Sequence, residues 1–210
     1  MIEKMSVHRA LSELKTYNSR INKAIKSSFV QANKKNNNKI DGISIEEFVK
    51  KLQGNFDSAK SLIENKKKLK AAIVLSNAST KVTIGNKEYT VAEAIERKQL
   101  LVDEKSFLDN LKFQYENQVR FINNKNDKLP QLLEQYLQAV LGEKDKRTVE
   151  DIEAHTKNFY SREEYILIDP MNINEYIEEL ENDIITFETN VDYVLSESNA
   201  TTFIEVDLCS

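Results

Sequence analysis

The strongest constraint on the fold is a regular spacing of apolar residues near the end of the chain. Over residues 173–194 the spacing alternates between four and three, at Ile173, Ile177, Leu180, Ile184, Phe187, Val191 and Val194. Residues spaced in this way share one face of an α-helix, and a repeat averaging 3.5 residues is typical of a coiled-coil seam. The pattern predicts a long helix that packs its seam against another helix.

Similar apolar stripes predict helices elsewhere. The first covers residues 7–25 and has Ser6 as its N-cap; a second follows Ser44, with Glu46 and Glu47 in its first turn. Acidic side chains in that position favour a helix start because they complement the helix dipole. A third helix begins at Thr90, where Glu93 three residues later forms a capping-box pattern. Its stripe has sevenfold spacing, at Ala94, Leu101, Leu108, Tyr115 and Ile122.

Shorter elements are predicted between and after these helices. Residues 129–141 and 149–160 indicate two short helices interrupted at Gly142, and residues 81–90 indicate a β-hairpin around Gly85-Asn86, since both residues tolerate positive φ. Residues 165–168 (YILI) and 201–207 (TTFIEVD) indicate strands. The predicted fold is mainly α: long antiparallel helices in a single domain over residues 1–210, with a small β-hairpin and a C-terminal strand. Residues 31–43 are interpreted as a polar loop insertion and residues 123–158 as a helical insertion.

Composition narrows the class of protein. The chain has only four glycines and two prolines, which disfavours loop-rich β-sandwiches. It has no run of 18 apolar residues and no apolar N-terminal segment, so we expect neither a membrane span nor a signal peptide. The only cysteine is Cys209, which is consistent with a reducing, cytoplasmic setting. A net charge of −4 with mixed signs gives no basic footprint for nucleic acid.

The sequence offers no motif for catalysis or metal binding. Residues 33–48 faintly resemble a calcium-binding EF-hand, but neither register supplies the required ligands, because Ser44 or Phe48 would occupy the twelfth position. His8 and His155 are far apart and form no zinc pattern. No G-x-S-x-G or glycine-rich phosphate loop is present. We therefore expect no catalytic residues, no metal and no cofactor.

Arginine is the most informative charged residue, since the chain has only six. A chain that uses lysine for solubility tends to keep arginine where a planar, bidentate donor is needed. Arg97 lies beside the stripe of the third helix, and Arg162 and Tyr160 lie in the YSREE segment, which we predict to be irregular. One hypothesis is that these three residues bind a phosphate or carboxylate. The alternative is structural ion pairing, of Arg97 with Glu93 or Glu104 and of Arg162 with Glu164.

Three local patterns resemble a small family of helical bacterial and phage proteins described as septicolysin-like. They are the N-terminal amphipathic helix, the stretch 75–101 (SNAS, a hairpin, then TVAEAIERKQLL), and the stretch from YSREEYILIDP to SNATTFIEV. The positions that match are Asn77, Thr90, Ala94, Arg97, Tyr160, Ser161, Arg162, Asn199 and Thr202, whereas Lys98, Gln99 and Ala200 depart from the family pattern. The resemblance implies a helical fold and no catalytic signature.

Two classes of function follow. The first is a non-catalytic, homo-oligomeric helical protein that holds a small anionic, nucleotide-like ligand through Arg97, Arg162, Tyr160 and Asn77. Phage proteins that sequester nucleotide immune signals belong to this class, and the Asn-, Lys- and Ile-rich composition suits an AT-rich phage, which would place the protein in the host cytoplasm. The second is a structural or protein-interaction module, such as a phage morphogenesis component, without a small-molecule ligand.

Overall fold

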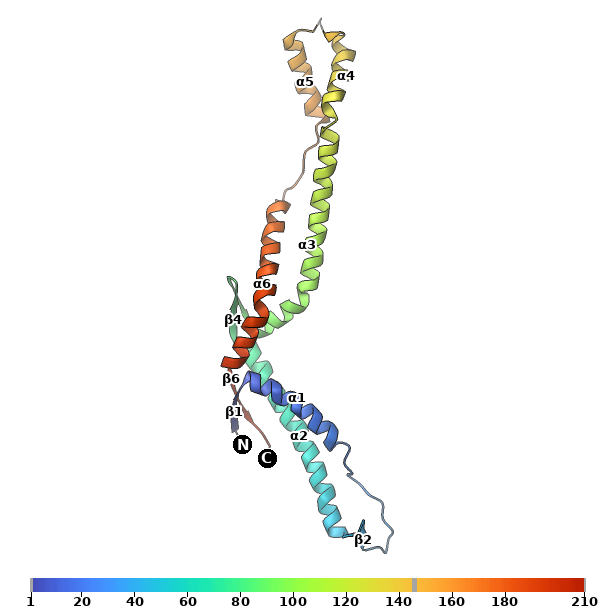
Figure 1. Ribbon diagram of the computed structural model, residues 1–210, viewed down its shortest axis with the longest axis vertical. Coiled ribbons are helices and arrows are strands. Elements are labelled where there is room, and N and C mark those ends of the chain that lie inside the picture. The colour runs from blue at the N-terminus through green and yellow to red at the C-terminus, as the bar shows by residue number, and fades with distance from the viewer. Residues whose placement is uncertain (1, 145–146, 210) are drawn as a thin grey trace. The chain divides into compact units, whose positions relative to one another are not determined.

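The computed structural model describes residues 2–144 and 147–209 and confirms the mainly α class with small β elements (Figure 1). The contacts divide the chain into two compact units. Unit 1 consists of Met1–Gln99 and Thr186–Ser210, and unit 2 of Leu100–Ile185. Within the described residues, no helix combines the length and the apolar character that crossing a membrane requires.

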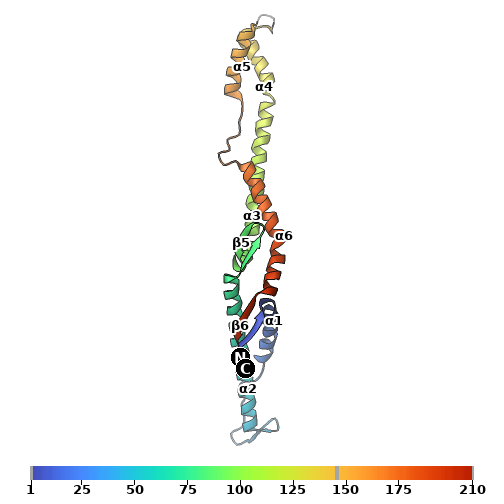
Figure 2. The ribbon, with the colours of Figure 1, turned by 90° about the vertical axis from the view of Figure 1, so that its left-hand side faces the viewer.

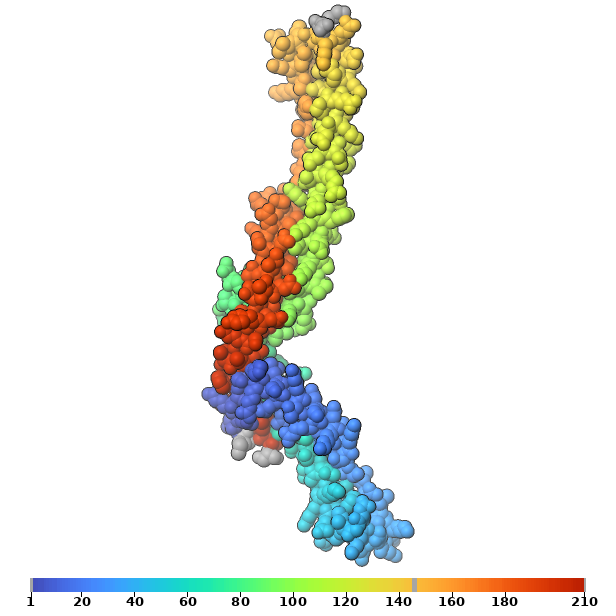
Figure 3. All heavy atoms as spheres, viewed as in Figure 1, coloured from blue at the N-terminus to red at the C-terminus, as the bar shows by residue number. Residues whose placement is uncertain are grey.

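Unit 1 is built on two helices that pack along each other, α1 (Val7–Ala24) and α2 (Ile45–Ser79) (Figure 3). Both begin where the sequence predicts. Ser6 caps α1 by accepting a hydrogen bond from the Arg9 N–H at 3.2 Å. Ser44 and Glu47 form a reciprocal capping box at the start of α2, which satisfies N–H groups that have no partner within the helix.

An N-terminal strand that the sequence did not predict completes the core of unit 1. β1 (Ile2–Ser6) pairs antiparallel with β6 (Phe203–Asp207), so that Met5 lies opposite Ile204 (Figure 2). Ile204 and Val206 alternate with exposed residues along β6 and face the core. The buried cluster combines this small sheet with both helices and consists of Met5, Val7, Ala10, Tyr17, Leu69, Ile73, Ile204 and Val206.

The predicted hairpin is present in unit 1 as β4 (Lys81–Ile84) and β5 (Lys87–Thr90). Gly85 has a φ of +60°, whereas Asn86 has no positive φ, so only the first turn residue uses the freedom that we expected at both. This is the pattern of a type II′ turn. A second, unpredicted pair, β2 (Lys39–Ile40) and β3 (Ile43–Ser44), closes the polar segment before α2.

Two long helices, α3 (Val91–Asn126) and α6 (Ile173–Thr201), contribute residues to both units. Thr90 and Glu93 form the predicted capping box at the start of α3. In unit 1 the α6 seam buries Phe187 and Val191, and in unit 2 it buries Ile177 and Ile184. Three seam positions are only half-buried: Ile173, Leu180 and Val194. The seam pattern predicts that Leu180 is buried, but the structure leaves this side chain half-buried.

Unit 2 also contains α4 (Leu129–Leu141) and α5 (Val149–Glu163), which pack against each other. Helix α5 is three residues longer than predicted, so Arg162 lies in its last turn and not in an irregular segment. The strand predicted over residues 165–168 does not form. Instead, the Asn126 side chain makes two hydrogen bonds with the backbone of Tyr165. It accepts from the Tyr165 N–H at 3.0 Å and donates to the Tyr165 carbonyl at 2.9 Å. The described residues of unit 2 include no strand with which this segment could pair.

Candidate ligand-binding cavity

Arg97, the first residue of the predicted anion site, is half-buried in unit 1 and packs against two aromatic rings. Its Cζ atom lies 4.4 Å from the centroid of the Phe187 ring and 5.8 Å from that of Tyr89. The guanidinium also donates a hydrogen bond to the Tyr89 hydroxyl, and the two rings meet edge to face. These contacts join α3, β5 and α6, and give Arg97 a structural role. Asn77, on α2 of the same unit, is half-buried and makes no side-chain hydrogen bond within the described residues.

Tyr160 and Arg162 lie on α5 in unit 2. Arg162 lines a cavity of about 110 Å³ together with Tyr136, Asn158, Phe159 and Glu163. Within the described residues its guanidinium has no hydrogen bond or ion pair, and the alternative pairing with Glu164 is not formed. The Tyr160 ring packs edge-on against Phe159. The four predicted ligand residues are thus divided between the units, Asn77 and Arg97 in unit 1 and Tyr160 and Arg162 in unit 2, and their joint action stays a prediction.

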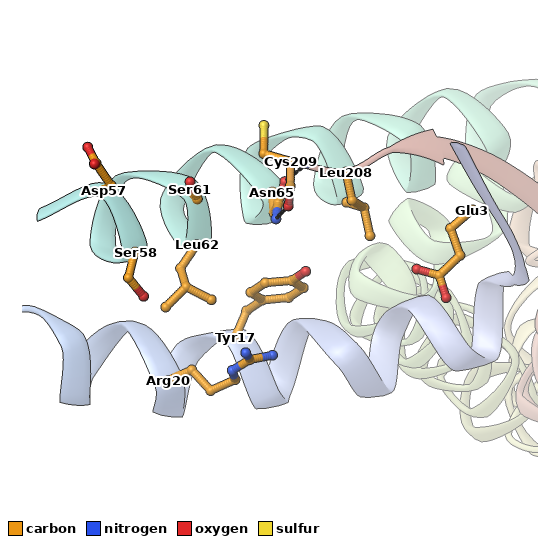
Figure 4. A pocket seen from close by; sticks show the side chains of 10 residues that line it. All are labelled: Glu3, Tyr17, Arg20, Asp57, Ser58, Ser61, Leu62, Asn65, Leu208 and Cys209. Carbon is orange, nitrogen blue, oxygen red and sulfur yellow. Dashed lines mark hydrogen bonds between the residues drawn. The ribbon is translucent and has the colours of Figure 1, made fainter. Parts of the chain in front are cut away.

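A larger cavity of about 510 Å³ lies within unit 1, between α1 and α2 and beside the residues that follow β6 (Figure 4). We call it the α1–α2 cavity. The residues that line it are Glu3, Tyr17, Arg20, Asp57, Ser58, Ser61, Leu62, Asn65, Leu208 and Cys209. Pockets for small molecules commonly measure about 300–1,000 Å³, so this volume is appropriate for one.

Asn65 anchors the chain after β6 to α2 at one side of the α1–α2 cavity. Its amide donates to the carbonyl of Cys209 at 2.9 Å and accepts from the Cys209 N–H at 2.6 Å. Asn65 is 6% exposed and is the one buried residue with an amide or charged side chain among those that the structure describes. One turn further on, the Lys68 ammonium donates to the carbonyl of Asp207 at 2.8 Å. Together these bonds hold the segment that forms part of the cavity wall.

Tyr17 forms the α1 side of the α1–α2 cavity. Its side chain is buried, and its ring extends from α1 toward Asn65 in Figure 4. Burial raises the pKa of the Tyr17 phenol above its ordinary value of 10.0; the Glu13 carboxylate also raises this pKa, and the Arg20 guanidinium lowers it. A hydrogen bond with the Asn65 side chain also lowers this pKa. The net direction is upward, so the phenol is protonated at neutral pH and its hydroxyl has a proton to donate.

Some charged side chains around the α1–α2 cavity have ion-pair partners and others do not. The Glu3 carboxylate already accepts a hydrogen bond from Arg9 at 2.6 Å. The Arg20 guanidinium, 6.0 Å from the Tyr17 ring centroid, has no hydrogen bond or ion pair among the residues that the structure describes. In Figure 4, Asp57 points away from α1, whereas Ser58 points toward it. An uncommitted cation and a hydroxyl donor thus remain on the facing helices.

The sequence did not predict the α1–α2 cavity, although it contains two signals for it. Arg20 is one of only six arginines. Asn65 occupies a stripe position, three residues after Leu62 and four before Leu69, where an apolar side chain is expected. A polar residue at a core position indicates a buried hydrogen-bond partner, but the partner, Cys209, is distant in the sequence and cannot be inferred from the stripe.

Comparison with family models, with curated proteins and with solved structures found no match for the chain. Within residues 2–144 and 147–209, no three His, Cys, Asp or Glu side chains come together in a way that could hold a metal ion. The candidate site is therefore defined by its own geometry: a polar cavity with one arginine that lacks an ion-pair partner.

Proposed function

We propose that the chain is a non-catalytic binding protein that assembles as a homo-oligomer and sequesters a small anionic, nucleotide-like ligand in the cytoplasm. The observation that carries this proposal is the Arg20 guanidinium, which has no ion-pair partner in the described structure and lines a cavity of about 510 Å³. An arginine presents two parallel N–H groups to a phosphate or carboxylate, and such bidentate pairs are among the stronger hydrogen bonds in proteins.

The other groups around the α1–α2 cavity suit a ligand that is part polar and part apolar. The Tyr17 phenol and the Ser58 hydroxyl supply hydrogen-bond donors for an anion, and Leu62 and Leu208 supply apolar surface. Small-molecule sites typically combine apolar walls with a few polar groups that fix the ligand's orientation. A nucleotide has this division, with its charge on the phosphate and its flat face on the base.

Arg162 is the second candidate contact, because it too lacks an ion-pair partner among the described residues and lines a cavity. That cavity, at about 110 Å³, is smaller than the roughly 300–1,000 Å³ of small-molecule pockets and is too small for a whole nucleotide. We propose that Arg162 contacts an anionic group at the surface. Tyr160 lies two positions earlier on α5, on another face of the helix, and does not line this cavity. Arg97 is the weakest candidate, since its guanidinium packs on Phe187 and donates to Tyr89.

Isothermal titration with AMP, adenosine and inorganic phosphate tests the proposal. We expect AMP to bind more tightly than neutral adenosine, and Arg20→Gln to weaken AMP binding at least tenfold, which is about 1.4 kcal/mol. Arg162→Gln tests the sequence-derived site in the same way. Arg120→Gln is the matched control, because Arg120 is exposed on α3 and lines neither cavity. No saturable binding of AMP or phosphate by the wild type would refute the proposal for this class of ligand.

The second candidate function, a protein-interaction module, is favoured by an exposed apolar face on α2. Val74 is 59% exposed and Leu75 is 72% exposed, and both line an apolar groove with Ala71 and Ala78. Contiguous apolar surface of this kind marks association sites. Light scattering measures the assembly: a particle of 24.3 kDa at micromolar concentration is a monomer and contradicts the homo-oligomer. An oligomer that Leu75→Asp dissociates, together with no anion binding, supports the interaction module.

A further inference from the structure

Unit 2 contains a separate cavity of about 220 Å³, formed by α3 and the segment that leads into α6. We call it the Asp169 cavity. Its walls are largely apolar, with Leu111 on α3 and Leu167, Pro170 and Met171 on the connecting segment. Its polar lining comes from Asp169 and from Gln114, Tyr115 and Gln118 on α3.

The Asp169 carboxylate is held in place by only one of its two oxygens. Oδ2 accepts a hydrogen bond from the Ile173 N–H at 2.7 Å and so caps the start of α6. Oδ1 is buried and has no hydrogen-bond partner within the described residues. Because the cap fixes the orientation of the carboxylate, Oδ1 cannot turn to solvent without breaking that cap. Buried carboxylate oxygens are nearly always hydrogen-bonded or paired with a cation.

The described residues around the Asp169 cavity leave this oxygen unsatisfied. The amide of Gln114 already donates to the side chain of Asn110 at 2.7 Å. Tyr115 and Gln118 line the cavity without a hydrogen bond to Asp169, and no lysine or arginine is among the lining residues. A ligand that fills the cavity therefore needs an N–H or O–H donor at one end and an apolar body, and a positive charge on the donor neutralises the carboxylate.

We propose that the Asp169 cavity binds a small organic monocation, a primary ammonium with an apolar body. One ammonium N–H donates to Oδ1 of Asp169, and the apolar body packs against Leu111, Leu167 and Met171. This site is independent of the α1–α2 cavity: it lies in the other unit and takes a ligand of opposite charge.

Benzylammonium and its neutral analogue benzyl alcohol are suitable probes, followed by the methyl NMR signals of the full chain. We expect benzylammonium to shift the Leu111, Leu167 and Ile173 methyl signals saturably, and benzyl alcohol to bind at least tenfold more weakly. The key variant is Asp169→Asn, because the asparagine side-chain oxygen can accept the same hydrogen bond from the Ile173 N–H but the side chain carries no charge. It should keep the melting temperature of the wild type and lose at least tenfold in benzylammonium affinity.

Asp109→Asn, an exposed site on α3, is the matched control and should bind like the wild type. Equal binding by Asp169→Asn, or no saturable shift with the wild type, overturns the proposal, and the second result leaves a water molecule as the donor to Oδ1. Arg20→Gln should leave benzylammonium binding unchanged, so a failure here is distinguishable from a failure of the anion site. If Asp169→Asn lowers the melting temperature, the comparison of benzylammonium with benzyl alcohol on the wild type decides the question by itself.

Discussion

Asn65 and Cys209 exchange two hydrogen bonds although 144 positions separate them in the sequence. The side-chain amide of Asn65 has a donor and an acceptor side by side, so it pairs with the backbone of Cys209 as a neighbouring strand would. This pairing attaches the residues that follow β6 to α2. The attached segment forms part of the wall of the α1–α2 cavity.

The first prediction concerns this pair. Asn65→Ala removes both hydrogen bonds and leaves the Cys209 backbone groups without protein partners, so we expect the free energy of unfolding to fall by about 1–3 kcal/mol. Urea denaturation measures the change. Gln53→Ala, an exposed position on the same helix, is the control and should stay within about 0.5 kcal/mol of the wild type. An equally small change in unfolding free energy for Asn65→Ala would mean that this side chain does not stabilise the position of the residues after β6.

The second prediction concerns the seam of α6. Phe187 is 1% exposed, so Phe187→Ala should cost about 3–5 kcal/mol in unfolding free energy, the usual range for a buried aromatic residue. Leu180→Ala should cost less than this, because Leu180 is only half-buried. Ile185→Ala, at a position 54% exposed on the same helix, serves as the control. Equal losses of unfolding free energy in Phe187→Ala and Ile185→Ala would mean that the buried face of α6 is assigned incorrectly.

The third prediction separates the structural from the ligand-binding role of Arg97. Since the guanidinium packs on Phe187 and donates to Tyr89, Arg97→Ala should reduce the unfolding free energy by about 1–2 kcal/mol, in the range for a cation–π contact with a hydrogen bond. Arg120→Ala is the control. Loss of AMP binding by Arg97→Ala with an unchanged melting curve would instead support the ligand role.

The fourth prediction is a pH dependence at the start of α3. The backbone N–H and the hydroxyl of Thr90 hold the pKa of the Glu93 carboxyl below its ordinary value of 4.5. The folded state thus binds this proton less readily than the unfolded state, so the stabilisation is complete above pH 4.5 and is lost as the pH falls through the lowered pKa.

Urea denaturation between pH 3 and pH 6 tests this, because Glu93→Gln keeps a capping side chain that does not titrate. The stability advantage of the wild type over Glu93→Gln should shrink as the pH decreases. Glu96→Gln, at an exposed position on the same helix, should show no such trend. A constant difference between the wild type and Glu93→Gln across this pH range would show that the carboxylate charge does not contribute.

Local patterns carried most of the successful predictions. Ser6, Ser44 and Thr90 cap the helices that follow them, and Gly85 forms the hairpin turn, because capping and turn geometry depend on residues within three or four positions of one another. The wrong predictions depend on distant partners. Residues 165–168 have the composition of a strand, but a strand needs a neighbouring strand with which to pair. The side chain of Asn126 forms hydrogen bonds with the backbone of Tyr165 instead.

The amino-acid order alone therefore accounts for the helical class, the helix starts and the seam of α6, since periodicity and capping are properties of short windows. The pairing of β1 with β6, the burial of Asn65 beside Cys209 and the α1–α2 cavity depend on residues that are far apart in the sequence. Such contacts form only when the helices pack, because the apolar pattern states which face is buried and not what lies against it.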